Sequence, residues 1–142
     1  MQYSPVEDFQ AWADERRIAA RYAPIHDMVT ARLAKTDPGG YVGIAEVIRN
    51  KFKPVGGEVR IADFMAHVAW RIRGCQNLDP EILDEREGPN RFETLGRYQR
   101  RLSREFSRCT RILEMGAKNR QFAEARMAES LLRRKPCTSV IQ

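Results

Sequence analysis

The segment from Phe92 to Leu113 carries two sets of side chains at helical spacing, one apolar and one made only of arginine. The apolar set recurs at intervals of three, four or seven residues, as on the buried face of a helix: Phe92, Leu95, Leu102, Phe106, Cys109 and Leu113. The second set, the arginine stripe, alternates intervals of four and three: Arg97, Arg101, Arg104, Arg108 and Arg111. Because Arg104 follows Leu102 by two residues, roughly 200° around a helix, the two sets lie on nearly opposite faces. The segment predicts a helix with one packed side and one side of guanidinium groups.

The strongest turn signal of the chain, Gly88-Pro89-Asn90, stands directly before this helix. On its other side, Ile61, Phe64, Met65, Val68 and Ile72 repeat at intervals of three and four. These patterns predict a helix over about 57–86, which Asp79-Pro80 kinks or splits, and an uninterrupted helix over about 90–134. Joined by a tight turn, the two make a long antiparallel helical hairpin with coiled-coil-like packing.

The amino-terminal part predicts shorter helices that cover one end of this hairpin. Ser4-Pro5-Val6-Glu7 is typical of a helix start with a capping box. Pro24 breaks or kinks that first helix, and Asp37 is a candidate cap in the turn that follows the second. Residues 41–52 favour a third helix, with a strand as the alternative, before a break at 53–57. We expect an all-α fold, with one domain over 1–135 and a disordered tail over 136–142.

The positive charge of the chain is concentrated in its carboxyl-terminal part. Residues 91–135 hold thirteen Lys or Arg and five Glu, a net charge of +8, which leaves −2 of the total of +6 for the remainder. A basic half beside a near-neutral half favours a polyanionic partner, either nucleic acid or an acidic protein surface. The alternative is a solvated face that keeps the protein soluble.

The three cysteines, Cys75, Cys109 and Cys137, are far apart and form no Cys-x-x-Cys pair. This spacing indicates neither a disulfide framework nor a zinc site, and reduced thiols fit a cytoplasmic protein. The amino terminus lacks the basic and apolar regions of a signal peptide, and no apolar run is long enough to span a bilayer. We therefore expect a soluble cytoplasmic protein with no membrane partner, metal or cofactor.

The arginine stripe is the best candidate binding site. Its charges lie about 5–6 Å apart along the helix, a separation comparable to phosphate spacing along a strand. The alternative is that the arginines form ion pairs, within the chain with Glu93, Glu105 and Glu114 or the acidic run at 84–87, or with another subunit. The candidate residues for contact with nucleic acid or an acidic partner are Arg97, Arg100, Arg101, Arg104, Arg108, Arg111 and Lys118.

Other chemical groups give weaker signals. Asp63, His67 and Arg71 share a helix face at intervals of four, but no nucleophile accompanies them, so a hydrogen-bonded surface trio is the favoured interpretation. Trp70 could stack on a base, although a Trp beside an apolar face more often lies at the edge of a core. The acidic residues between 79 and 87 match no metal-binding loop. We expect no enzymatic activity.

Two stretches resemble a known group of proteins. One is Pro54-Val55-Gly56-Gly57 with a helix that ends Ala69-Trp70-Arg71-Ile72-Arg73 and is followed by Pro80-Glu81-Ile82-Leu83. The other runs from Arg97-Tyr98-Gln99 through Leu102-Ser103-Arg104 to Leu113. Together they resemble a widespread group of uncharacterised bacterial helical proteins with a Trp-Arg-Leu-Arg helix and an Arg-Tyr-Glu-x-x-Leu-x-Arg helix. That group has no established activity, so the resemblance implies a helical hairpin of bacterial or phage origin and no site residues.

The sequence thus predicts a non-enzymatic basic helical protein that contacts the nucleic-acid backbone within a bacterial or phage mobile-element or defence assembly. The alternative is a helical oligomerisation or adaptor module. In that case the apolar side of the last helix pairs with another chain, a second copy included, and the arginines steer an acidic protein surface.

Overall fold

The computed structural model describes the backbone of residues 11–78 and 89–139, and the side chains of 14–78 and 93–133. The described residues form five α-helices and no strand, which confirms the all-α prediction. The helices are α2 (Ala11–Arg21), α3 (Ala23–Thr36), α4 (Gly40–Phe52), α5 (Glu58–Gln76) and α7 (Pro89–Ser139).

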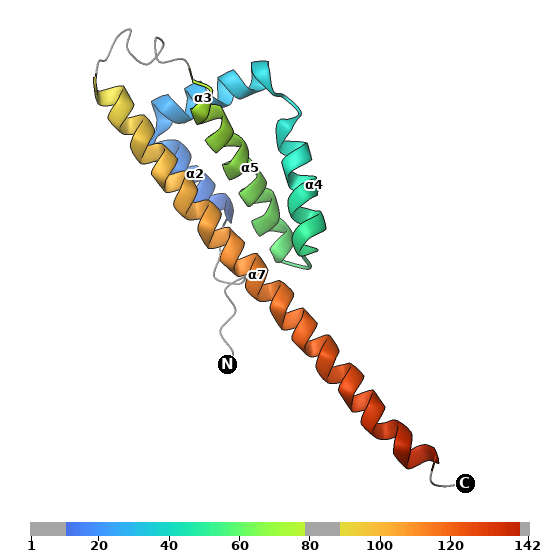
Figure 1. The fold of residues 1–142 in the computed structure, drawn as a ribbon. Helices are drawn as coiled ribbons and strands as arrows, with labels where there is room; N and C mark the ends of the chain where they lie inside the picture. The colour runs from blue at the N-terminus through green and yellow to red at the C-terminus, as the bar shows by residue number, and fades with distance from the viewer. Residues whose placement is uncertain (1–10, 79–88, 140–142) are drawn as a thin grey trace.

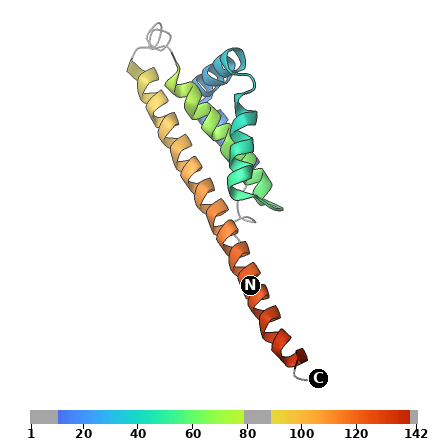
Figure 2. The same ribbon diagram turned by 45° about the vertical axis from the view of Figure 1, so that its right-hand side comes forward.

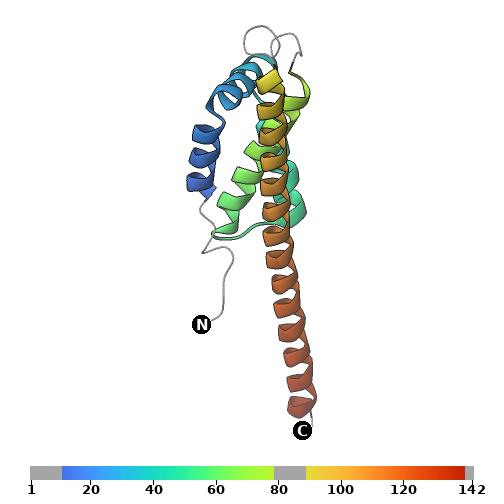
Figure 3. The ribbon, with the colours of Figure 1, turned by 90° about the vertical axis from the view of Figure 1, so that its left-hand side faces the viewer.

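Helix α5 lies at the centre of the bundle and packs against α2, α3, α4 and α7. The first half of α7 runs beside α5 in the opposite direction, and the second half continues past the bundle as a single helix (Figures 1 and 2). Figure 3 shows α2 and α4 on different sides of the α5–α7 pair. The hairpin arrangement of the two longest helices is therefore present, with shorter helices packed around it.

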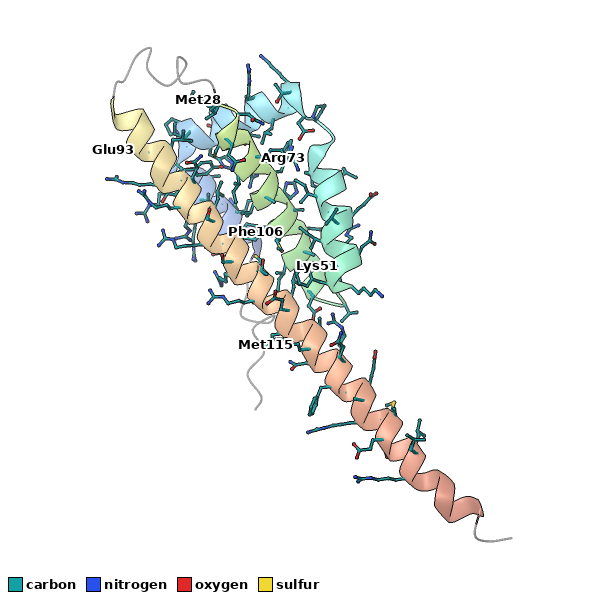
Figure 4. All side chains as sticks on the ribbon, viewed as in Figure 1. Met28, Lys51, Arg73, Glu93, Phe106 and Met115 are labelled. Carbon is teal, nitrogen blue, oxygen red and sulfur yellow. The ribbon has the colours of Figure 1, made fainter. Side chains whose placement is uncertain are left out.

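The apolar residues of α7 form one side of the core, as their spacing predicts. Leu102, Cys109 and Leu113 are fully buried, and Leu95 is nearly so. Phe106 is half-buried, on the side of α7 that faces α5 (Figure 4). The side chain of Phe92 lies outside the described residues. A further fully buried residue, Tyr98, is the largest such side chain in the described part of the protein.

Helix α5 ends at Gln76, shortly before the predicted interruption at Asp79-Pro80. The part of the predicted helix from 79 on, with its expected end near 86, lies outside the described residues and stays a prediction. The backbone N–H of Asn77 donates hydrogen bonds to the carbonyls of Gly74 and Cys75, which closes the last turn of α5. Residues 79–88, with Asp79-Pro80 and the acidic run, lie outside the described residues.

Helix α7 is unbroken, as predicted, and slightly longer than the predicted 90–134. It begins at Pro89, because proline suits the first turn of a helix where its missing N–H costs no hydrogen bond. It passes through Gly116 without interruption and ends at Ser139. Residues 136–139 of the predicted tail are therefore helical, while 140–142 lie outside the described residues.

The amino-terminal helices follow the predicted breaks. Pro24 occupies the first turn of α3 and separates it from α2. Residues 40–52 form a helix rather than the alternative strand. The break after α4 contains Lys53 and Gly56, both at positive φ. The predicted start at Ser4–Glu7 lies outside the described residues. The two described cysteines, Cys75 and Cys109, are free and buried, and burial raises the pKa of each thiol to about 12.

The predicted side-chain cap at Asp37 was wrong. Helix α4 has Gly39 at its cap position and no side-chain hydrogen bond there. The backbone N–H of Asp37 instead closes α3 on Leu33, and its carbonyl accepts a hydrogen bond from Trp70 Nε1 at 3.1 Å. Its carboxylate pairs with Arg73 at 3.3 Å. The turn between α3 and α4 is thus held by α5 rather than by its own cap.

Gly74 sets the close approach of α5 to α3, and its replacement tests this packing. A Cβ at Gly74 would lie 2.8 Å from Leu33 Cγ and 2.9 Å from Val29 Cγ1, inside the core. We expect Gly74→Ala to lower the free energy of unfolding by about 1–2 kcal/mol, because overpacking outweighs the gain in helix propensity. The matched control is Gly43→Ala on α4, where a Cβ meets nothing within 4 Å and stability should rise by up to about 1 kcal/mol. Urea unfolding measures both, and equal changes would contradict the packing argument.

Candidate functional site

Most of the predicted site residues lie on one exposed side of α7. We define the outer face of α7 as five exposed basic residues in the part of the helix before 120, none of which forms an ion pair with another described residue: Arg97, Arg100, Arg104, Arg111 and Lys118. Figure 4 shows side chains that end in nitrogen on the side of α7 turned away from α5. The prediction that the apolar and arginine sets lie on opposite sides of one helix is confirmed for Arg97, Arg104 and Arg111.

Arg101 and Arg108 do not belong to this outer face, which corrects the predicted stripe. Arg101 Nε lies 3.2 Å from Glu105 Oε1, and Arg108 Nη1 lies 3.4 Å from Asp14 Oδ2 and 3.5 Å from Glu105 Oε2. Both carboxylates are buried. The reason is helical geometry, because Arg101 and Arg108 lie roughly 40–60° around the helix from Arg104, on the side that meets α2.

The acidic residues near the outer face offset only part of its charge. Glu93 and Glu114 are exposed and form no ion pair with described residues. Since Glu105 is engaged with Arg101 and Arg108, it does not reach the outer face either. Five cations therefore face solvent on about six turns of one helix, an arrangement that attracts anions and carries a small cost when unoccupied.

A shallow depression lies on this face. It has a volume of about 570 Å³ and is lined by Gly96, Gln99, Arg100, Ser103 and Arg104. Gly96 leaves the surface open, and the Arg100 guanidinium folds back toward it, 3.8 Å from where a Cβ would stand. The lining offers an amide, a hydroxyl and two guanidinium groups, and it contains no carboxylate. This set of hydrogen-bond donors suits a phosphate oxygen better than a cation.

The predicted trio on α5 does not form. Asp63 pairs with Arg49 at 2.8 Å and Arg71 pairs with Glu15 at 2.9 Å, and neither forms a hydrogen bond with His67. His67 stacks on Tyr41 with ring centroids 4.4 Å apart, and its Nδ1 has no hydrogen-bond partner among the described residues. Burial is the main cause that lowers the pKa of His67. A neutral stacked imidazole of this kind is a packing group.

Trp70 lies at the edge of the core, which is the more common of its two predicted roles. Its ring is half-buried and tilted against Tyr41, with centroids 6.1 Å apart. Its N–H is held by the carbonyl of Asp37. Within the described ranges no three His, Cys, Asp or Glu side chains come together in a metal-binding arrangement.

Sequence reasoning missed two buried polar contacts that position α7. The first joins His26 Nδ1 and the Tyr98 hydroxyl at 2.8 Å, across 72 positions of the chain. Burial, followed by the charge of Arg71, lowers the pKa of His26, so the imidazole is neutral near pH 7. The second joins Arg120 to Glu58 at the start of α5. Neither partner pair lies within helical spacing, so no periodic pattern could have found them.

The carboxyl-terminal part of α7 packs against no other described helix along residues 121–133. Every described side chain from 121 to 133 is exposed, and Figure 1 shows this segment beyond the other helices. Four large apolar residues lie here, each more than half exposed: Phe122, Met127, Leu131 and Leu132. Their exposure is typical of a helix that meets another chain.

Searches against family models, curated proteins and solved structures find no match to this chain. A search of the described helices finds none that is both long enough and apolar enough to cross a membrane.

Proposed function

We propose that this protein is a non-enzymatic helical subunit that contacts the nucleic-acid backbone through the outer face of α7. The observation that carries the proposal is the row of Arg97, Arg100, Arg104, Arg111 and Lys118, exposed along one continuous helix and unpaired with other described residues. Guanidinium groups fork onto phosphate oxygens and stay charged at any physiological pH.

The spacing of the row supports a linear polyanion. Arg97, Arg104 and Arg111 recur every seven residues, a rise of roughly 10.5 Å along the helix. Three successive phosphates of one strand of a duplex rise by roughly the same distance along the duplex axis, at about 3.4 Å for each step. Because the row offers only charge and N–H donors, we expect contacts to phosphate and sugar rather than a readout of base sequence.

The setting of this activity follows from the resemblance described above. We propose a bacterial or phage mobile-element or defence assembly, in which α7 lies along DNA or RNA held by other subunits.

Reversal of the charge on the outer face tests the proposal. We expect the triple variant Arg97→Glu, Arg104→Glu and Arg111→Glu to bind single- and double-stranded DNA or RNA about 100-fold more weakly at low salt. The slope of log affinity against log salt should fall by about two to three, since each phosphate contact contributes about 0.7–0.9. An electrophoretic shift series over salt measures both quantities.

The matched control reverses three exposed cations elsewhere, Arg32→Glu, Lys35→Glu and Arg60→Glu, which form no ion pair with described residues. This control has the same net charge, so its salt slope should stay close to that of the unchanged protein. Equal losses in both variants, or no binding of the unchanged protein to any of these nucleic acids at low salt, would contradict the proposal.

A second candidate function rests on a different observation, the exposed apolar residues at 121–133. They favour an oligomerisation or adaptor module in which the end of α7 pairs with another helix. Light scattering over a range of protein concentrations tests this candidate. If the protein associates with itself, its apparent mass should rise with concentration. A mass that is independent of concentration removes the self-association version.

A further inference from the structure

A cavity between α2 and α7 is lined by three arginines. It has a volume of about 620 Å³, and its lining residues are Arg17, Ile18, Ala20, Arg21, Tyr22 and Arg101. Arg17 and Arg21 stand one helical turn apart on α2, and Arg101 approaches from α7. Helix packing thus brings together cations that lie about 80 positions apart in the sequence.

The two arginines of α2 are available to a ligand. Both are exposed. The nearest carboxylate to Arg17 is Asp14, whose Oδ1 is 3.8 Å away, a loose contact that is not a hydrogen bond. Arg21 forms no ion pair with a described residue, and its guanidinium carbon lies 5.8 Å from the centre of the Tyr22 ring. Neither guanidinium donates a hydrogen bond to another described side chain.

Arg101 also keeps hydrogen-bonding capacity. It reaches Glu105 through Nε, at 3.2 Å, but this buried Nε is not aligned for a hydrogen bond. Its two terminal nitrogens have no partner among the described residues, and they belong to a side chain that lines the cavity. Two apolar residues of the lining, Ile18 and Tyr22, are buried, which strengthens electrostatic attraction at this position.

The charges around the cavity do not balance. Among the described residues, Arg17, Arg101 and Arg108 contact the two carboxylates of Asp14 and Glu105 beside the cavity, and Arg21 in its lining adds a fourth guanidinium group without an ion pair. The local excess of two positive charges favours an anion in the cavity. Three guanidinium groups from two helices line the cavity. A phosphate group places its oxygens tetrahedrally and can accept from donors on both helices, whereas the two oxygens of a carboxylate lie in one plane.

We propose that this cavity is a binding site for a phosphate group. The site is separate from the outer face of α7 and goes beyond the proposed function, because Arg17 and Arg21 belong to α2. The phosphate has two sources, a free or terminal phosphate monoester, or a phosphodiester of a nucleic-acid strand. Both are recognised by the same guanidinium groups.

Titration of the full-length protein with inorganic phosphate tests the site. Sodium phosphate replaces sodium chloride at constant ionic strength and pH, and two-dimensional ¹H–¹⁵N spectra follow the Arg101 side chain and the backbone of 17–22. We expect saturable shifts at these positions. The double variant Arg17→Gln and Arg21→Gln should weaken phosphate binding at least about tenfold, since it removes two charged donors.

The matched control, Arg32→Gln with Arg60→Gln, has the same net charge and should bind phosphate as the unchanged protein does. Shifts that stay linear in phosphate, or an equal loss in both double variants, would overturn the proposal. Thermal unfolding confirms that both variants fold, which is expected because all four side chains are exposed.

Two further experiments identify the source of the bound phosphate and distinguish this proposal from the proposed function. An oligonucleotide without a terminal phosphate that reproduces the Arg101 shift supports a phosphodiester occupant, whereas shifts with inorganic phosphate alone support a free or terminal phosphate. The variant with Arg97, Arg104 and Arg111 changed to Glu should keep its response to inorganic phosphate. If this variant loses nucleic-acid binding but still shows the shifts with inorganic phosphate, the result supports a cavity site that is independent of the outer face.

Discussion

Tyr98→Ala is expected to lower the free energy of unfolding by about 4 kcal/mol, because it empties the centre of the contact between α7 and the amino-terminal helices. The Tyr98 ring is fully buried. It lies 5.5 Å from the Tyr22 ring and 5.8 Å from the His26 ring, centroid to centroid. Truncation removes these contacts and leaves a cavity that the two neighbouring rings cannot refill without moving. Urea unfolding followed by circular dichroism measures the change.

Tyr98→Phe separates the packing of the ring from its hydrogen bond. This variant keeps the aromatic contacts but leaves His26 Nδ1, 2.8 Å from the lost hydroxyl, without its partner. We expect a loss of about 1–2 kcal/mol, the usual cost of one buried hydrogen bond. Equal losses in the Phe and Ala variants would show that the hydroxyl, rather than the ring, carries the contribution of Tyr98.

Glu58→Gln is expected to lower the free energy of unfolding by about 2–3 kcal/mol. Arg120 Nη1 lies 2.5 Å and 2.7 Å from the two carboxylate oxygens of Glu58, and Arg120 Nη2 donates to the carbonyls of Phe52 and Lys53 at 3.0 Å and 3.2 Å. The substitution leaves a partly buried guanidinium without its counter-charge. A fully buried pair would lose about 3–5 kcal/mol, and the partial exposure of Arg120 reduces that figure.

A surface pair on the same helix gives the matched control. Arg133 and Glu129 form an equally direct contact of 2.8 Å, but both side chains are more than half exposed. We expect Glu129→Gln to change stability by less than about 0.5 kcal/mol. Double-mutant cycles combine Arg120→Gln with each Glu→Gln variant. The free energies of unfolding should show coupling between Arg120 and Glu58 and none between Arg120 and Glu129. Similar losses for the two Glu→Gln variants would contradict the distinction between them.

Glycine at position 116 belongs to the same contact. A Cβ on Gly116 would lie 2.4 Å from Glu58 Oε2, so the carboxylate occupies the space that a side chain would fill. This explains why a residue of low helix propensity stands within the long α7 helix. The ion pair and the glycine together fix the point at which α7 leaves the bundle.

Features that depend on local period could be predicted from the sequence. The buried positions of Leu102, Cys109 and Leu113 and the unbroken course of α7 followed from spacing alone. The break at 53–57 followed from its proline and glycines. In each case the determining residues are neighbours in the chain, so the pattern contains the information.

Features that depend on which helix lies beside which could not be predicted. The spacing of the arginine stripe predicts one face, but only the position of α2 decides that Arg101 and Arg108 turn toward Asp14 and Glu105. The same holds for Glu58 and Arg120, which lie 62 positions apart. The end of α5 at Gln76 could not be placed from the sequence, because a period of three and four shows where a helix packs and not where its backbone turns.

The projection of α7 sets the distance between the helical bundle and the tip of this helix. Residues 121–139 continue the helix for roughly 28 Å past Arg120, at 1.5 Å per residue. Any molecule held at the tip is therefore kept that far from the bundle by a spacer of fixed length. Two copies joined end to end through this segment would hold their bundles about 55 Å apart, a span set by the number of residues in the helix.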